Sequence, residues 1–280
     1  MLEHTDSIES FEAAGGLSLA PLQPAASAFW DIHAFGSVNS TNEVVKEALR
    51  KGAAEGFCAT SLEQTGGYGR QGRVWTSPVG GLYTSFALHP KVAPSMLPTL
   101  SLVTSLAVAD ALEKVQPLCA PLIKWPNDVL CAEGKLAGIS LEALAGGVCV
   151  GVGINVYRPA MQEDIAGKYR SAYVMEGIAE PQLSQNQRSI MTRAIETMLA
   201  AMETRYRIWC KEGFSAFIDE YSARFAYRNK KATLALIDGT ETIEGVIRGV
   251  DDLGRLLVED AAGTLVPMSS GEVHVTAFEA

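Results

Sequence analysis

The chain has 280 residues, 48% of them hydrophobic, and carries a formal net charge of -9. This length and apolar content predict a core large enough for one large domain or two unequal ones. The acidic balance argues against binding to DNA or RNA irrespective of sequence, because contacts to phosphates require a surplus of Lys and Arg on one face.

The cysteine spacing and the distribution of apolar residues exclude several other classes of protein. The five cysteines show no CxxC spacing, which predicts reduced, mostly buried thiols rather than a disulfide framework or a zinc site. The N-terminus has no basic segment before an apolar run, and the most apolar stretch, 97–112, is too polar for a membrane span. We therefore expect a cytoplasmic protein that binds neither membranes nor nucleic acid. The cysteines are Cys58, Cys119, Cys131, Cys149 and Cys210.

The N-terminal third predicts a lead-in, a strand, a helix and a long loop. Residues 1–27 have no clear period and predict a poorly ordered segment, too short for a separate DNA-binding domain. A strand is expected from Phe29 to Val38, and Ser40 and Glu43 then have the spacing of a capping box at a helix start. The glycine-rich segment 66–81 is expected to be a loop between strands. Its length suggests a lid that orders when a ligand binds.

The remaining sequence mixes helices with strands up to residue 225 and then contains only strands and turns. These patterns predict a large domain over 28–226 and a small β domain of SH3-like size over 227–280. The expected strands are 57–62, 82–88, 122–125, 129–132, 135–144, 148–156, 232–237, 242–249, 255–259, 264–268 and 272–276, and the expected helices are 96–115, one containing Ile190 to Trp209, and 214–225.

The glycine-rich loop carries the first candidate site. Its glycines satisfy GxGxxG, but the sequence continues through Arg73 to Trp75 rather than into a helix, which disfavours dinucleotide binding. A flexible loop explains the composition better, because glycines let backbone amides approach a ligand while Arg70 and Arg73 neutralise carboxylate and phosphate oxygens. Trp75 supplies a ring that closes over a base. Taken alone, the segment is explained equally well by a solvated turn.

Two further segments combine residue types that core packing alone does not select. The stretch from Lys124 to Asp128 ends an apolar strand in a charged, amide-rich corner that contains a proline. Lys135 follows, with Gly138 where a side chain would obstruct a ligand, and residues 151–155 place two glycines and an asparagine in a buried strand. Each has an ordinary structural explanation as well: a turn, a solvated lysine, and a bulged strand with a hydrogen-bonded asparagine.

Together, five segments in this order resemble the motif set of biotin protein ligases, and the resemblance runs from about Trp30 to the C-terminus. It implies an α+β fold in which a class II synthetase-like mixed or antiparallel sheet is flanked by helices, with a small C-terminal SH3-like β barrel. The segments are Ser40-Thr41-Asn42, Gln64 to Trp75, Lys124 to Asp128, Lys135 to Ile139 and Gly151 to Asn155, and Ser270 to Val273 also resembles the end of the family's C-terminal domain.

The resemblance further implies a role for each matching residue, and biotin, ATP and Mg²⁺ as ligands, without indicating which residues would bind the metal. The implied residues are Lys135, Arg70 and Arg73 for catalysis; Ser40, Thr41, Asn42, Gln64, Gly67, Tyr68, Gly69, Arg70, Lys135 and Gly138 for biotin; and Arg73, Trp75, Lys124, Asn127, Asp128 and Asn155 for the nucleotide.

The implied reaction forms biotinyl-5'-AMP and transfers biotin to a lysine of a biotin carboxyl carrier protein. Two positions depart from the family pattern. Tyr68 stands where the family loop has its first arginine, and Thr276 stands where some relatives carry an arginine near the nucleotide. The helix-turn-helix module of the repressor-type members is not matched. A homodimer formed through an exposed sheet edge is also possible.

Two other functions stay open at the level of sequence. A lipoate or octanoate protein ligase would share the catalytic fold, but the amide of Gln64 suits the ureido group of biotin, and the corner from Lys124 to Asp128 also favours biotin. A non-catalytic module that holds biotinyl-5'-AMP is the second alternative. Lys135 and the two loop arginines favour catalysis.

Overall fold

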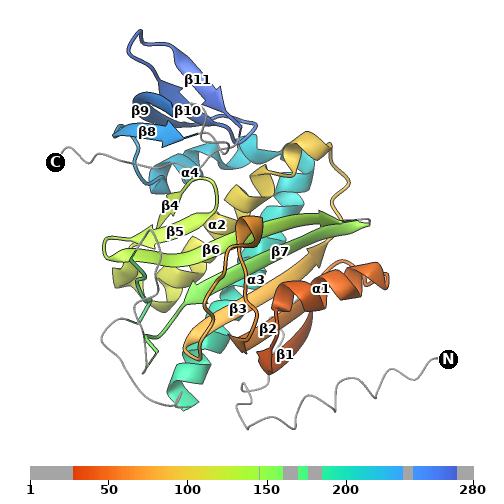
Figure 1. Cartoon of the computed structure of the whole chain (residues 1–280). Coiled ribbons are helices and arrows are strands. Elements are labelled where there is room, and N and C mark those ends of the chain that lie inside the picture. The colour runs from red at the N-terminus through yellow and green to blue at the C-terminus, as the bar shows by residue number, and fades with distance from the viewer. Residues whose placement is uncertain (1–27, 145, 160–169, 176–184, 236–241, 270–280) are drawn as a thin grey trace.

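A computed structural model describes residues 28–144, 146–159, 170–175, 185–235 and 242–269. They form a large mixed sheet flanked by helices, with a smaller sheet packed at one end (Figure 1). Within these ranges no helix is both long and apolar enough to cross a bilayer.

The large sheet has seven strands in the order β1-β2-β3-β7-β6-β5-β4. Only β1 and β2 are parallel, and α1 (Thr41–Arg50) makes the crossover that a parallel pair requires. All other neighbours are antiparallel, which confirms the expected mixed sheet. The strands are β1 (Asp31–Val38), β2 (Phe57–Gln64), β3 (Gly81–Leu88), β4 (Leu122–Lys124), β5 (Asp128–Cys131), β6 (Gly134–Leu144) and β7 (Gly147–Asn155).

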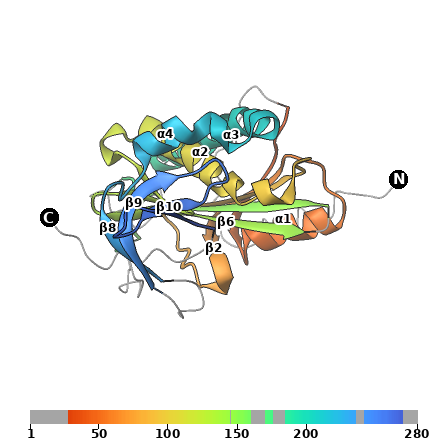
Figure 2. The same ribbon diagram turned by 90° about the horizontal axis from the view of Figure 1, so that it is seen from above.

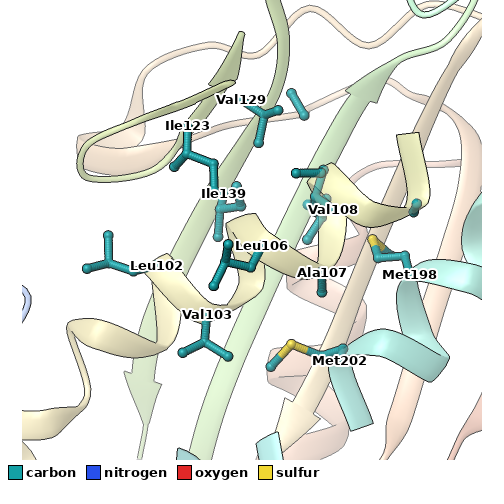
Figure 3. Packing of buried hydrophobic residues seen from close by; sticks show 14 of the residues in the cluster. Leu102, Val103, Leu106, Ala107, Val108, Ile123, Val129, Ile139, Met198 and Met202 are labelled. Carbon is teal, nitrogen blue, oxygen red and sulfur yellow. The ribbon is translucent and has the colours of Figure 1, made fainter. Parts of the chain in front are cut away.

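Three helices cover one face of this sheet: α2 (Thr99–Val115), α3 (Gln185–Glu212) and α4 (Ile218–Arg224) (Figure 2). A helix that is apolar around most of its circumference must be buried, and most residues of α2 are buried. Figure 3 shows the reason: α2 lies between the sheet, here Ile123 and Ile139, and α3, here Met198 and Met202.

The opposite face of the sheet is covered by α1 at one end. Val45 and Leu49 of α1 pack against Ala59, Ala87 and Cys149, which come from β2, β3 and β7. Because side chains alternate between the two faces of a strand, every second residue of β7 beyond Cys149 points toward this same side. The part of this face that lies beyond α1 contains the candidate site.

The C-terminal strands form an antiparallel sheet in the order β11-β10-β9-β8. It matches the expected small β domain. The segment between the end of α4 and the start of β8 contains the expected domain boundary at 226/227, and this boundary stays a proposal. The lead-in 1–27, the strand expected at 272–276, the segment Ser270 to Val273 and Thr276 lie outside the described residues. The strands are β8 (Lys231–Ala235), β9 (Thr242–Val250), β10 (Leu256–Glu259) and β11 (Leu265–Met268).

The predicted capping box at the start of α1 is wrong. Ser40 is the N-cap residue, but its side chain makes no capping hydrogen bond. The backbone N–H of Thr41 instead donates to Oε1 of Gln64 at 2.8 Å, and Glu43 accepts a hydrogen bond from Tyr68 and pairs with Lys46. Gln64 and Tyr68, from a distant segment, and Lys46, from the same helix, have replaced the reciprocal capping bonds.

Two predicted helices begin differently from the sequence pattern. The helix expected over 96–115 starts at Thr99, after a separate 3-10 turn over Pro94–Met96. The helix expected over 214–225 divides into a 3-10 turn, Phe214–Phe217, and α4. Prolines and aromatic residues at these helix starts are accommodated by the tighter turns.

All five cysteines are free thiols, as predicted, but the expectation that most are buried is wrong. Only Cys58 and Cys149 are buried, and the other three are half-buried. Even so, partial burial raises the pKa of Cys119 to about 11. A thiol with so high a pKa is a weak nucleophile near neutral pH.

Removal of a core side chain from α2 should destabilise the whole large domain. Leu106 has no exposed surface, so Leu106→Ala should lower the free energy of unfolding by about 3 kcal/mol through lost apolar burial and a residual cavity. Leu118 is 90% exposed, so Leu118→Ala should change it by less than about 0.5 kcal/mol. Urea unfolding of both variants measures the difference, and equal effects would contradict the packing described for α2.

Candidate active site

Glycines make one region of the sheet surface flat. In the β6–β7 pair, Gly138 lies opposite Gly153, and Ser140 lies opposite Gly151. The residues that alternate with the β7 glycines are apolar and buried in the core with α2 and α3. The glycines therefore face the other way and form a floor without large side chains, over which the loop between β2 and β3 passes (Figure 1).

The indole ring of Trp75 rests on this floor. A Cβ atom added at Gly138 would lie 3.2 Å from Cζ3 of the ring, and one added at Gly153 would lie 2.7 Å from Nε1. Nε1 is buried and has no hydrogen-bond partner among the described residues. We expected Gly138 to leave room for a ligand, and in this structure that room is occupied by the indole.

Lys135 lies beside the ring and is held by a carboxylate. Its Nζ is 4.9 Å from the centre of the Trp75 ring and 2.7 Å from Oδ1 of Asp128. The side chains of the ion pair are only 21% and 13% exposed, so solvent screens it less than a surface pair. Asn155 fixes the backbone at the same point, because its Nδ2 donates to the carbonyl oxygen of Lys135 at 3.1 Å.

The loop also contacts the corner that connects β4 to β5. Nη1 of Arg70 donates to Oδ1 of Asn127 at 3.1 Å, and Nδ2 of Asn127 donates to the Ile139 carbonyl at 2.9 Å. Loss of water around its guanidinium lowers the pKa of Arg70; the charge of Asp128 raises it and that of Arg73 lowers it. The structure therefore brings both arginines, Asn127 and Asp128 into one electrostatic group.

A second cluster lies at the start of α1. Oε1 of Gln64 accepts hydrogen bonds from the backbone N–H and the hydroxyl of Thr41, at 2.8 and 3.0 Å. Nε2 of Gln64 donates to the hydroxyl of Ser77 at 3.0 Å. The amide of Gln64 is therefore oriented by protein atoms, and a ligand bound here would exchange partners with them.

Asn42 extends this cluster across the sheet. Its Oδ1 accepts from the hydroxyl of Ser85 at 2.7 Å, and its Nδ2 donates to the hydroxyl of Ser140 at 3.2 Å. A Cβ atom at Gly151 would lie 2.1 Å from Oδ1 of Asn42, so only glycine fits there. Our sequence reasoning missed Ser85 and Ser140. Their signal was a polar residue at a buried strand position, with Ser140 two residues after Gly138 and thus on the same face.

Tyr68, the departure from the family loop, is bound to two carboxylates. Its hydroxyl lies 2.8 Å from Oε1 of Glu43 and 3.0 Å from Oε1 of Glu142, and it donates its single proton to one of them at a time. Nζ of Lys46 pairs with both carboxylates, at 2.6 and 3.0 Å. Burial raises the pKa of Tyr68, and the hydrogen bond with Lys46 opposes this rise. These three partners of Tyr68 were not predicted.

Comparison with known proteins identifies the family. Residues 34–157 match the Biotin/lipoate A/B protein ligase family, and residues 234–275 match the Biotin protein ligase C terminal domain. The biotin--[acetyl-CoA-carboxylase] ligase of Paracoccus denitrificans is 31% identical over 81% of this chain and 94% of its own length. The chain belongs to the biotin protein ligase family. The ligase of the same name from Mycobacterium tuberculosis is 30% identical over 89% of this chain and 90% of its own length.

A solved member of the family has the same fold. The biotin protein ligase from Aquifex aeolicus in complex with biotin and ATP superposes with a TM-score of 0.72 and 28% identity, over 87% of this chain and 97% of that one. The expected fold, a synthetase-like mixed sheet followed by a small SH3-like domain, is thereby confirmed.

The residues selected from the family motifs fall into two groups on one face of the sheet. One group lies over β5, β6 and β7, where Trp75 of the loop contacts Lys135, and it also contains Asp128 and Asn155. The other group, Thr41 and Gln64, lies at the start of α1. Lys124 and Ser40 are buried beside these groups, and Arg73 is exposed. No three His, Cys, Asp or Glu side chains in the described part of the chain are grouped to hold a metal ion.

Loss of the Tyr68 hydroxyl should loosen the loop of this family member. Tyr68→Phe removes a hydrogen bond to a carboxylate worth about 1.5 kcal/mol, so the open loop should become about tenfold more populated. Limited trypsin digestion measures this as faster cleavage after Arg70 and Arg73, because cleavage follows the open population. The control is Glu47→Gln, which changes an α1 carboxylate paired with Arg50 instead. Equal cleavage rates in both variants would contradict an anchoring role for Tyr68.

Proposed function

We propose that this chain is an ATP-dependent biotin protein ligase. It forms biotinyl-5'-AMP from biotin and ATP, and it transfers biotin to a lysine of a biotin carboxyl carrier protein. The observation that carries the proposal is the grouping, in a member of this family, of the Lys135–Asp128 pair, Trp75 and Arg70 over a floor of glycines.

The proposed reaction requires positive charge beside the carboxylate of biotin and the α-phosphate of ATP. A carboxylate is a poor acyl donor, because its charge repels nucleophiles and oxide is a poor leaving group. In the first step a carboxylate oxygen of biotin bonds to the α-phosphorus of ATP, and the bond to pyrophosphate breaks. In the second step the acceptor amine bonds to the activated carbonyl carbon, AMP leaves and the amine loses a proton. Lys135, Arg70 and Arg73 stabilise the phosphoryl oxygens in the first step.

The two groups of residues support a proposed placement of biotin. Thr41 and Gln64 present a hydroxyl and an amide to the ureido ring, supported by Ser40 and Asn42. The valerate chain then runs along the glycine face under Gly67, Tyr68 and Gly69 toward Lys135. A carbon chain fits over glycines because no side chain obstructs it.

The nucleotide is proposed to bind at the other end, between the loop and the β4–β5 corner. Lys124, Asn127, Asp128 and Asn155 line this end, and Mg²⁺ enters as part of the substrate, bound mainly by the phosphates of ATP. Trp75 occupies the glycine floor in the structure, so it must move or stack on the base when ATP binds. We therefore expect the loop to act as a lid that keeps water from the mixed anhydride.

The acceptor and the assembly are proposals as well. The acceptor lysine belongs to a biotin carboxyl carrier domain, and its identity is open. A homodimer would use a strand at an end of the large sheet, where β1 is partly exposed and β4 is bridged to Phe225. A cytoplasmic location, expected from the N-terminal sequence, stays a prediction.

Pyrophosphate release measured with biotin, lipoate and octanoate in turn tests the proposed function. Only biotin should support release, followed by transfer to a carrier domain. Release with lipoate or octanoate at a comparable rate would assign the chain to that branch of the family. Tight binding of biotin without release or transfer would instead indicate a non-catalytic module.

Replacement of the half-buried Lys135 should remove most of the rate. Lys135→Ala should lower the turnover of adenylation by roughly 100-fold or more, because a preorganised charge at the phosphoryl group is lost. Lys51→Ala is the control, since Lys51 lies at the exposed end of α1. Single-turnover formation of biotinyl-5'-AMP measures the effect, and near-normal rates for Lys135→Ala would remove Lys135 from the mechanism.

A further inference from the structure

The corner from Lys124 to Asp128 is held from the C-terminal sheet. The side chain of Trp125 is buried, and its Nε1 donates to the carbonyl oxygen of Gly254 at 2.8 Å. Gly254 lies in the turn between β9 and β10, more than a hundred residues later in the chain. The small sheet therefore contacts the proposed nucleotide site through a directed hydrogen bond.

Hydrogen bonds within the turn that contains Gly254 hold this carbonyl in place. The carboxylate of Asp251 accepts from the backbone N–H groups of Leu253 and Arg255, at 3.1 and 2.8 Å, and from Nε of Arg255 at 2.6 Å. Gly254 has φ +72, a conformation that favours glycine. The Gly254 carbonyl is thereby fixed in direction.

Gly254 also packs directly on the start of α2. A Cβ atom at this position would lie 2.8 Å from Cγ2 of Thr99 and 2.9 Å from Cδ1 of Leu102. Thr99 is itself held, because its hydroxyl accepts from Nε1 of Trp209 at 2.8 Å and donates to the Met96 carbonyl at 2.6 Å. The turn therefore fits closely against a part of the large domain that is tied in place.

The same part of α2 contacts the corner. The hydroxyl of Ser101 donates to the Pro126 carbonyl at 3.0 Å, and the N–H of Ile139 donates to the Asn127 carbonyl at 2.8 Å. The corner is thus fixed by α2, by β6 and by the Trp125–Gly254 bond. We call Trp125, Gly254, Thr99, Leu102 and Ser101 the interdomain joint.

We propose that the interdomain joint positions the nucleotide-binding corner, with Trp125 and Gly254 as its positioning residues. They act through Asn127 and Asp128, which contact Arg70 and Lys135. The inference rests on the proposed function. It adds that the C-terminal sheet influences the affinity for ATP through this corner, and that glycine is required at position 254.

The joint should affect ATP and biotin differently. Thr41 and Gln64, proposed to bind the ureido ring of biotin, and their neighbour Ser85 lie on α1, β2 and β3. The corner lies at the β4–β5 end of the sheet. Displacement of Gly254 would loosen Trp125 and then Asn127 and Asp128. The expected result is a higher KM for ATP with little change in the affinity for biotin.

The decisive comparison is between two glycines of the C-terminal sheet. Gly254→Ala should raise the KM for ATP in biotin-dependent pyrophosphate exchange by about tenfold, the effect of losing one well-placed hydrogen bond. Gly263→Ala is the matched control, because Gly263 has φ +80 and no atom within 4 Å of an added Cβ. It carries the same backbone strain without the contact to α2, and its KM should stay near that of the wild type.

Each outcome decides between the two proposals. Wild-type protein that lacks biotin-dependent exchange would overturn the proposed function. Active wild type, with Gly254→Ala indistinguishable from Gly263→Ala, would overturn the joint alone. An equal loss of biotin affinity, measured by calorimetry, would indicate general destabilisation and also overturn it. Should Gly254→Ala fail to fold, Trp125→Phe, which removes the N–H and keeps an aromatic ring, should raise the KM for ATP in the same way.

Discussion

The rest of this structure depends on the alternation of residues along β6 and β7. Apolar side chains on one face bury α2 and α3, and this burial supplies the core of the domain. On the other face, beyond the part that α1 covers, Gly138, Gly151 and Gly153 bring no side chains that could bury a helix, and this surface is left for the loop and a ligand. One pair of strands therefore stabilises the fold with one face and shapes the site with the other.

The loop over this face is held at three points rather than at its ends alone. Tyr68 is bound to carboxylates of α1 and β6, Arg70 to Asn127, and Trp75 lies on the glycines. A phenol and a guanidinium bind such partners in different ways, because the phenol brings no fixed positive charge. At the loop position where the family motif has an arginine, Tyr68 thus supplies a contact between the loop and the scaffold and no fixed positive charge.

The two sheets act on one site from different directions. The large sheet carries Lys135 and the glycine floor, and the small sheet reaches the neighbouring corner through the bond from Trp125 to Gly254. Because packed interiors resist small displacements, a shift of the turn at Gly254 would also shift Trp125 and the corner. This arrangement gives the C-terminal sheet a place in the chemistry as well as in the fold.

The sequence by itself determined the element order, because periodicity and turn residues are local properties, and its family resemblance implied a mixed or antiparallel sheet and a common site for the motif segments. Through that resemblance it assigned Lys135, Asp128 and Trp75 to one ligand site. Only the tertiary structure decided their partners: the Gln64 bond that replaced a capping box, the indole on Gly138 and Gly153, and the carboxylates around Tyr68. Such contacts join residues far apart in the chain, so they depend on register and packing that no local pattern contains.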